Sequence, residues 1–383
     1  MHAPMARERR TRLDTAPPER ELPKVFEGEV VLGQHAALGT LKSALASAHF
    51  PHAWIFHGPA GTGKFLAATE LARLLLDVET TSAHITAFKA PRGTRAALLL
   101  DVGAHPDFHI IRKEMAESSS MREVRERKQT NIPLDLLREL MLGGPIGDGK
   151  SLDSPIWKTA YLGHGKVFVI DEAELLDANG QNALLKTLEE PPPGTYIVLV
   201  TTQEDRLLPT IRSRCQRVAF APLVERDMDV WMRRAEIPQE QWSWIRTFAD
   251  GSPGLASLAA RHALEAWSQE LGVKLDAIER GKFDPLVAEY LATRVDEFAE
   301  GVVKENAKSS KEAANRLGFR LLALLIARRL RDSMQRAASQ RNAQTLDDCV
   351  RRTDLLARAE AELRSNVNLK QLLANLMAQW VLP

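Results

Sequence analysis

The sequence predicts an α/β protein in which a parallel sheet carries a phosphate-binding loop and is followed by helices. First, the glycine-rich stretch 57–65 joins a short apolar run at 54–56 to a helical apolar pattern at 66–76. Second, the runs at 166–170 and 196–200 are unbroken and rich in β-branched and aromatic residues, as in strands buried on both faces. Third, the final third of the chain shows helical periodicity and no strand pattern.

The loop has the chemistry of an anion site. Glycines let successive backbone N–H groups turn toward one point at the positive end of the following helix, where a lysine can reach terminal phosphates. The predicted nucleotide-binding residues are Gly58, Pro59, Ala60, Gly61, Thr62, Gly63 and Lys64. Phe65 stands where the motif needs a hydroxyl for Mg²⁺, so ATP or ADP binding is expected without a secure metal site. The alternative is a loop that only turns a strand into a helix.

Composition narrows the class of protein. The chain has 383 residues, which predicts two or three domains, and its 51 Lys plus Arg against 50 Asp plus Glu argue against a whole-surface polyanion binder. Two cysteines, Cys215 and Cys349, lack metal-ligand spacing and fit a reducing cytoplasm. No apolar run is long enough to span a membrane, so we expect a soluble, cytoplasmic protein.

Two segments are expected outside the core. Residues 1–24 are rich in Arg, Glu and Pro without apolar periodicity, which predicts a disordered tail. A basic arm that contacts nucleic acid is the alternative for this tail. Residues 112–130 are charged and contain several serines, which predicts an exposed insertion.

Polar side chains follow the two buried strands. Asp171 and Glu172 come directly after 166–170, and Thr202 follows the next strand. Ligands bind off the carboxyl ends of parallel strands, so Asp171 is suited to organising Mg²⁺ and Glu172 to polarising water. Thr202 could sense a terminal phosphate. Acids that only begin a helix, and a threonine that is only common in strands, are the plain alternatives.

Arginines cluster at 212–217, with Arg214 at their centre. A solvated basic surface is the usual explanation for such a cluster. The alternative is a guanidinium offered to a neighbouring subunit's triphosphate, because its planar fork matches phosphate geometry.

Together these segments resemble bacterial sliding-clamp loaders of the AAA+ class over about residues 30–220. The motifs are Val31-Leu32-Gly33-Gln34, Pro51-His52-Ala53, the P-loop, His105-Pro106-Asp107, Val169-Ile170-Asp171-Glu172-Ala173, Thr201-Thr202, Ser213-Arg214-Cys215 and the run from Asn182 to Pro192. The last two are specific to clamp loaders rather than to P-loop proteins at large.

Within that family the ATP-hydrolysing gamma/tau motor and the delta-prime type of subunit share the pattern. Departures at three places point to the delta-prime type: Phe65 follows the P-loop lysine, 77–104 contains no cysteine for a zinc module, and Gly254 replaces the sensor arginine of the lid. The resemblance therefore implies no zinc, at most weak or vestigial ATP/ADP binding, and no ATPase activity of the chain alone.

The resemblance also implies an architecture and a role. We expect an AAA+ base domain (25–221), a small helical lid (222–266) and an all-α collar (267–383) in a hetero-oligomeric ring. The partners would be the gamma/tau motor and delta subunits of DNA polymerase III, the sliding clamp and, through the complex, primed DNA. Arg214 would be the finger that acts in trans, with Glu172 and Thr202 as catalytic and sensor positions. Two rivals remain: a self-sufficient motor, and a scaffold with a relic P-loop.

Overall fold

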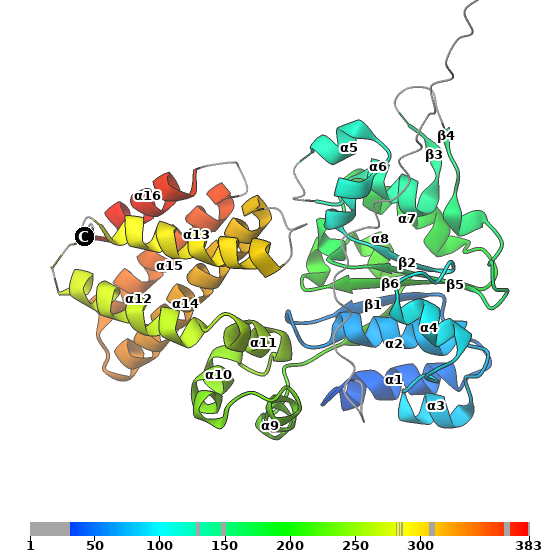
Figure 1. Ribbon diagram of the computed structural model, residues 1–383, viewed down its shortest axis with the longest axis horizontal. Helices are drawn as coiled ribbons and strands as arrows, with labels where there is room; N and C mark the ends of the chain where they lie inside the picture. The colour runs from blue at the N-terminus through cyan, green and yellow to red at the C-terminus, as the bar shows by residue number, and fades with distance from the viewer. Residues whose placement is uncertain are drawn as a thin grey trace, which may run out of the picture. The chain divides into compact units, whose positions relative to one another are not determined.

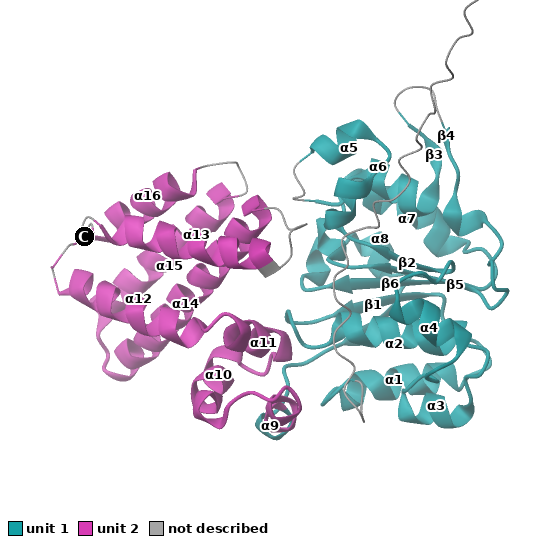
Figure 2. Ribbon diagram, viewed as in Figure 1, with its two compact units in different colours: residues 1–227 teal, residues 228–383 magenta. Residues whose placement is uncertain are grey.

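A computed structural model describes residues 31–127, 131–146, 151–280, 282, 284, 286–305, 311–363 and 368–381. The chain divides into two compact units, Met1–Asp227 and Met228–Pro383 (Figure 2). The expected disordered tail, 1–24, lies outside the described residues. The first unit holds the sheet, and the second is helical in its described residues.

A five-stranded parallel sheet organises the first unit, as predicted (Figure 1). Its strand order is β2-β5-β6-β1-β7. The strands are β1 (Ala53–His57), β2 (Phe108–Ile111), β5 (Lys166–Ile170), β6 (Thr195–Thr201) and β7 (Gln216–Ala219). Two-residue strands β3 (Gly144–Pro145) and β4 (Ser151–Leu152) form a separate antiparallel pair. β5 is buried throughout, because helices cover both faces of a sheet whose neighbouring strands are joined by crossovers.

Helices flank the sheet on both sides (Figure 1). One apolar cluster includes Leu41, Trp54, Phe56 and Leu71, and a second on the other face includes Ile55, Ile170 and Leu184. The α-helices are α1 (His35–Leu45), α2 (Lys64–Leu76), α3 (Ser82–Ala87), α4 (Arg95–Asp101), α5 (Arg122–Glu126), α6 (Leu134–Leu137), α7 (Ala178–Glu189) and α8 (Pro209–Arg212). Shorter turns are η1 (Lys113–Ser118), η2 (Arg138–Leu142), η3 (Pro155–Trp157), η4 (Ala173–Leu175) and η5 (Glu204–Arg206).

The expected exposed insertion at 112–130 stays a prediction; over its described part, 112–127, most side chains are exposed or partly buried and a few are buried. This segment forms η1 and α5, and Ala116 and Val124 are buried in the second apolar cluster. The Ser119 hydroxyl and the Ser120 N–H also donate to Glu139. Its composition predicted exposure because the few apolar side chains that anchor it are spaced among many charged ones.

Helices build the second unit: α9 (Glu225–Arg234), which straddles the boundary, then α10 (Trp242–Ala249), α11 (Pro253–Arg261), α12 (Leu264–Glu279), α13 (Val287–Glu305), α14 (Lys311–Ser339), α15 (Ala343–Leu363) and α16 (Leu369–Val381), with the short turn η6 (Gln239–Gln241). On the last helix an apolar stripe is buried at Leu372, Leu373, Leu376, Met377 and Trp380. A division into lid (222–266) and collar (267–383) stays a prediction.

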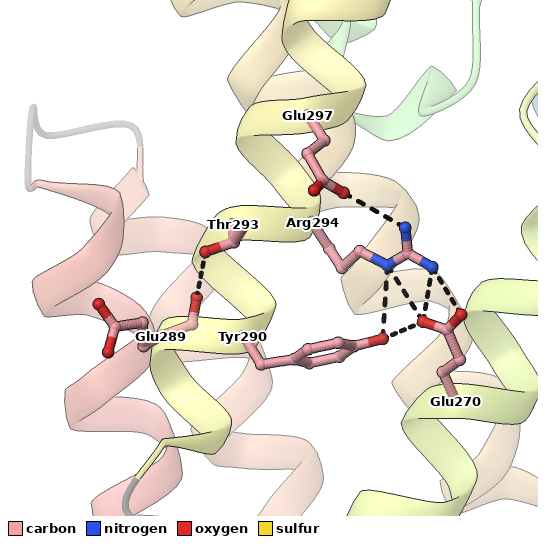
Figure 3. A network of polar contacts seen from close by, with 6 residues as sticks. All are labelled: Glu270, Glu289, Tyr290, Thr293, Arg294 and Glu297. Atoms are coloured by element: carbon pink, nitrogen blue, oxygen red, sulfur yellow. Dashed lines mark hydrogen bonds and ion pairs between the residues drawn. The ribbon is translucent and has the colours of Figure 1, made fainter.

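Ion pairs connect these helices. Arg294 on α13 donates from Nη2 to both carboxylate oxygens of Glu270 on α12 at 2.6 Å, and the Tyr290 hydroxyl donates to the same carboxylate (Figure 3). Arg294 also donates to Glu297 on its own helix at 3.2 Å. The hydrogen bonds from Arg294 and Tyr290 hold the pKa of Glu270 below its usual range. The network fastens α13 to α12.

Several arginines of α14 and α15 are likewise paired within the unit. Arg328 and Arg331 both donate to Asp250 at 3.1 Å, and Arg352 donates to Glu279 at 3.2 Å. Arg329 also contacts Glu279, at 3.1 Å.

Candidate functional site

The glycine-rich loop leaves β1 and enters α2 as predicted. Gly58, Gly61 and Gly63 have φ values of 134°, 74° and 95°, a region that L side chains rarely adopt. At Gly58 a Cβ would lie 2.0 Å from the carbonyl oxygen of Phe220. This position therefore requires glycine for both backbone conformation and space.

Lys64 is the first residue of α2 and is buried. Its ammonium donates to the carbonyl oxygen of Gly58 at 2.7 Å and to that of Pro59. Burial lowers the pKa of this lysine to about 8, opposed by the charges of Glu174 and then Asp171. An ammonium has three N–H donors, so one donor remains beyond these two bonds for a phosphate oxygen.

Phe65 follows the loop lysine as the second residue of α2. Its partly buried ring packs against the apolar cluster that α2 shares with the sheet. A benzyl side chain has no oxygen for Mg²⁺, so the structure gives this position a packing role.

Gln34 was quoted in a motif but given no role by sequence reasoning. This side chain is buried and donates to the carbonyl oxygens of Thr62 at 3.2 Å and Ala221 at 2.7 Å, while it accepts from the N–H of Ala221 at 3.1 Å. It thus joins the P-loop to the segment that follows β7. A buried amide of this kind is satisfied only by long-range partners, which the sequence does not reveal.

Asp171 and Glu172 stand at the carboxyl end of β5, as predicted, but they differ in environment. Asp171 is buried at 7% exposure, and Glu172 has a positive φ of 53°. Glu172 forms an ion pair with Lys113, which follows β2. Because β2 and β1 lie on opposite sides of β5 in the sheet order, this pair draws the Glu172 carboxylate away from the P-loop.

Glu174 is a site residue that sequence reasoning missed. Its Oε1 accepts from the Thr202 hydroxyl at 2.5 Å and from the Thr202 N–H at 3.2 Å. Its Oε2 is buried without a hydrogen-bond partner among the described residues. The sequence signal that could have found it is the third acid, at 174, which closely follows the acidic pair at the end of β5. The structure therefore places Thr202 beside the P-loop strand, engaged by a carboxylate.

Arg214 lies at the other edge of the sheet. It precedes β7, at the amino ends of the strands, and donates to Glu189 at the end of α7. Its Nη1 also donates to the carbonyl oxygen of Thr210 at 2.9 Å, and 34% of its side chain is exposed. The P-loop follows the carboxyl end of β1, whose five residues span roughly 16 Å. Arg214 is thus separated from its own chain's P-loop by the length of a strand.

Within the described residues, no group of three or more His, Cys, Asp or Glu side chains is arranged to hold a metal ion. Gly254, expected at a sensor position, lies in the first turn of α11. None of the described helices is long and apolar enough to cross a membrane.

Comparisons with known proteins identify relatives of this chain. Residues 33–224 match the family model described as DNA polymerase III, delta subunit. DNA polymerase III subunit delta' of Pseudomonas aeruginosa is 33% identical over 54% of this chain and 55% of its own length. That of Escherichia coli is 30% identical over 54% and 53%. Subunit gamma/tau of Mycobacterium bovis is 29% identical over 53% of this chain and 30% of its length.

Among solved structures, a DNA polymerase III gamma subunit-related protein from Thermotoga maritima aligns with 90% of this chain and 98% of its own, at 20% identity and a TM-score of 0.40. The chain spans about half the length of the curated delta' relatives that it matches. The family match covers the region from Gln34 through the glycine-rich loop to the segment after β7. The chain therefore belongs to the DNA polymerase III delta-subunit family, where it is a delta-prime-like clamp-loader subunit.

Proposed function

We propose that this chain is a clamp-loader subunit that does not turn over ATP itself and that supplies Arg214 to the ATP site of a neighbouring motor subunit. The observation that carries the proposal is the placement of Arg214. It is partly exposed at the sheet edge opposite its own P-loop, so a phosphate that it contacts belongs to another subunit. A guanidinium supplied in trans stabilises charge that develops on the transferred phosphoryl group.

The chain's own site supports the other half of the proposal. Phe65 packs in the apolar cluster and provides no metal ligand, and Glu172 is paired with Lys113. Both features remove groups that an ATPase uses to hold Mg²⁺ and orient water. Partners follow from the same proposal: gamma/tau motor and delta subunits, a sliding clamp and primed DNA.

The test is ATP turnover by a reconstituted clamp-loader complex that contains Arg214→Ala, with Arg217→Ala as the matched control. Arg217 is an exposed arginine three residues away that pairs with Glu204 instead. We expect Arg214→Ala to assemble normally and to lower turnover roughly two- to tenfold, because one of several ATP sites loses its finger. Equal turnover by the two variants would remove the finger assignment.

A second measurement distinguishes the rival functions. The purified chain alone, with Mg²⁺ and primed DNA, should give no ATP turnover above background. Robust turnover that disappears in Lys64→Ala would identify a self-sufficient motor. If instead complexes with Arg214→Ala are fully active and the chain binds no nucleotide, the chain is a scaffold.

A further inference from the structure

The Thr202 hydroxyl is held by an acid at the place where a bound nucleotide would end. In the pairing of β6 with β1, Thr201 lies opposite His57. Thr202 and Gly58 are the next residues, so they leave the sheet side by side, on strands roughly 5 Å apart. The carboxylate of Glu174, bonded to both the hydroxyl and the N–H of Thr202, is therefore fixed at the mouth of the phosphate-binding loop.

A second observation indicates that this carboxylate shares the loop's electrostatic environment. The charge of Glu174 raises the pKa of Lys64 more than that of Asp171 does, in opposition to the dominant effect of burial. Its Oε2 is buried and has no hydrogen-bond partner in the described part of the chain. An unpaired buried carboxylate oxygen is costly and repels a further anion.

We propose that Glu174 acts as a built-in competitor for a terminal phosphate, so that this P-loop accepts a nucleoside diphosphate in preference to a triphosphate. The proposal rests on the proposed function only in that the loop is a nucleotide site. A triphosphate would bring its terminal oxygens to Thr202, where the donors are already used and the nearest charge is negative. A diphosphate ends one phosphate earlier and keeps the loop N–H groups and Lys64.

Two neighbouring residues strengthen the expected preference for a diphosphate over a triphosphate. Glu172 carries the same charge on the same strand end, yet its pair with Lys113 compensates it. Phe65 provides no oxygen to hold a cation that would screen Glu174 from a triphosphate. The discrimination therefore depends on the charge of Glu174, which, unlike that of Glu172, lies in no ion pair among the described residues.

The experiment titrates the full chain, alone, with fluorescent N-methylanthraniloyl derivatives of ADP and ATP, each with Mg²⁺ and with EDTA. Glu174→Gln keeps the size of the side chain and an acceptor for Thr202 while removing the charge. Glu190→Gln, at an exposed acid that follows α7, is the matched control. We expect the unmodified chain to bind the diphosphate roughly tenfold more tightly than the triphosphate. Glu174→Gln should tighten triphosphate binding until the two are nearly equal, with diphosphate affinity changed less than about twofold.

Three results would overturn the proposal: a preference that Glu174→Gln leaves unchanged, an equal change in Glu190→Gln, or weaker Mg²⁺-triphosphate binding in Glu174→Gln, which would make Glu174 a metal ligand. Absence of binding by both the unmodified chain and Glu174→Gln would overturn it as well. Thermal melting confirms that each variant is folded, and Glu174→Ala serves if the glutamine variant is not. Turnover by complexes with Arg214→Ala does not depend on this site, so the two proposals fail separately.

Discussion

Arg214 and Glu189 form an ion pair at the amino edge of the sheet, between the segment that precedes β7 and the end of α7. Both side chains are partly exposed, at 34% and 49%. A solvent-exposed pair of this kind contributes little to stability, so its role is to set the direction of the guanidinium.

Replacing Glu189 with glutamine should accordingly leave the fold intact. We expect urea unfolding to change by less than about 1 kcal/mol, because exposed ion pairs contribute at most that much. In a reconstituted complex, ATP turnover should stay closer to that of the parent than to that of Arg214→Ala, since glutamine still accepts a hydrogen bond from Arg214. A loss as large as that caused by Arg214→Ala would show that Glu189 itself contributes to the neighbouring site.

Lys64 gives the stability of the protein a pH dependence. Burial lowers its pKa from 10.5 to about 8, so between these values the unfolded chain binds more protons than the folded one. Raising the pH through this window therefore stabilises the fold, and the cost of the buried charge is greatest below pH 8. The change between pH 7.5 and 9.5 should be roughly 2 kcal/mol relative to Lys64→Met.

Urea unfolding of the parent, Lys64→Met and Lys186→Met at the two pH values measures this effect. Lys186 is exposed on α7 and controls for loss of a surface charge. The free energy of unfolding of the parent should rise relative to that of Lys64→Met at the higher pH. Relative to that of Lys186→Met it should not change. A shift of opposite sign would mean that the folded loop stabilises the charged ammonium.

Partial burial should slow the reaction of the Cys215 thiol with alkylating reagents. It raises the pKa of this thiol to about 12. Since only the thiolate reacts, alkylation at pH 8 should be at least ~100-fold slower than in urea. Mass spectrometry of native and denatured protein treated with N-ethylmaleimide gives both rates, and Cys349→Ser leaves a single thiol to follow. Rapid native labelling would place the Cys215 sulfur in contact with solvent.

Much of the fold could be read from local patterns. The buried strands at 166–170 and 196–200 and the loop before Lys64 have continuous apolar or glycine signals, and the structure confirms each as an element. The parallel sheet was predicted from these patterns. In the described part of segment 112–130 the short helical turns could not be predicted, because two buried apolar side chains, Ala116 and Val124, are too few to produce a period.

The long-range side-chain contacts of the site could not be predicted from local patterns in the same way. Lys113 and Glu172 are 59 residues apart, and Gln34 and Ala221 are 187 apart. Such contacts depend on which strands become neighbours and on where each side chain leaves its turn. Glu174 shows the difficulty: its spacing from Glu172 was visible, but only the pairing of β6 beside β1 brings Thr202 to it.

Gly58 and Gly39 offer a matched test of the loop's backbone. At Gly58, alanine would bring a Cβ within 2.0 Å of the Phe220 carbonyl oxygen at a φ of 134°, whereas at Gly39, exposed within α1, a Cβ meets nothing within 4 Å. Gly58→Ala should destabilise the protein by at least about 2 kcal/mol through strain and steric overlap. Gly39→Ala should stabilise it by roughly 0.5–1 kcal/mol, because alanine loses less backbone entropy in a helix. Urea unfolding of both variants checks the two signs together. Equal and small effects would mean that the P-loop rearranges to accept a side chain, and that the close approach of β1 to the segment after β7 is not required for the fold.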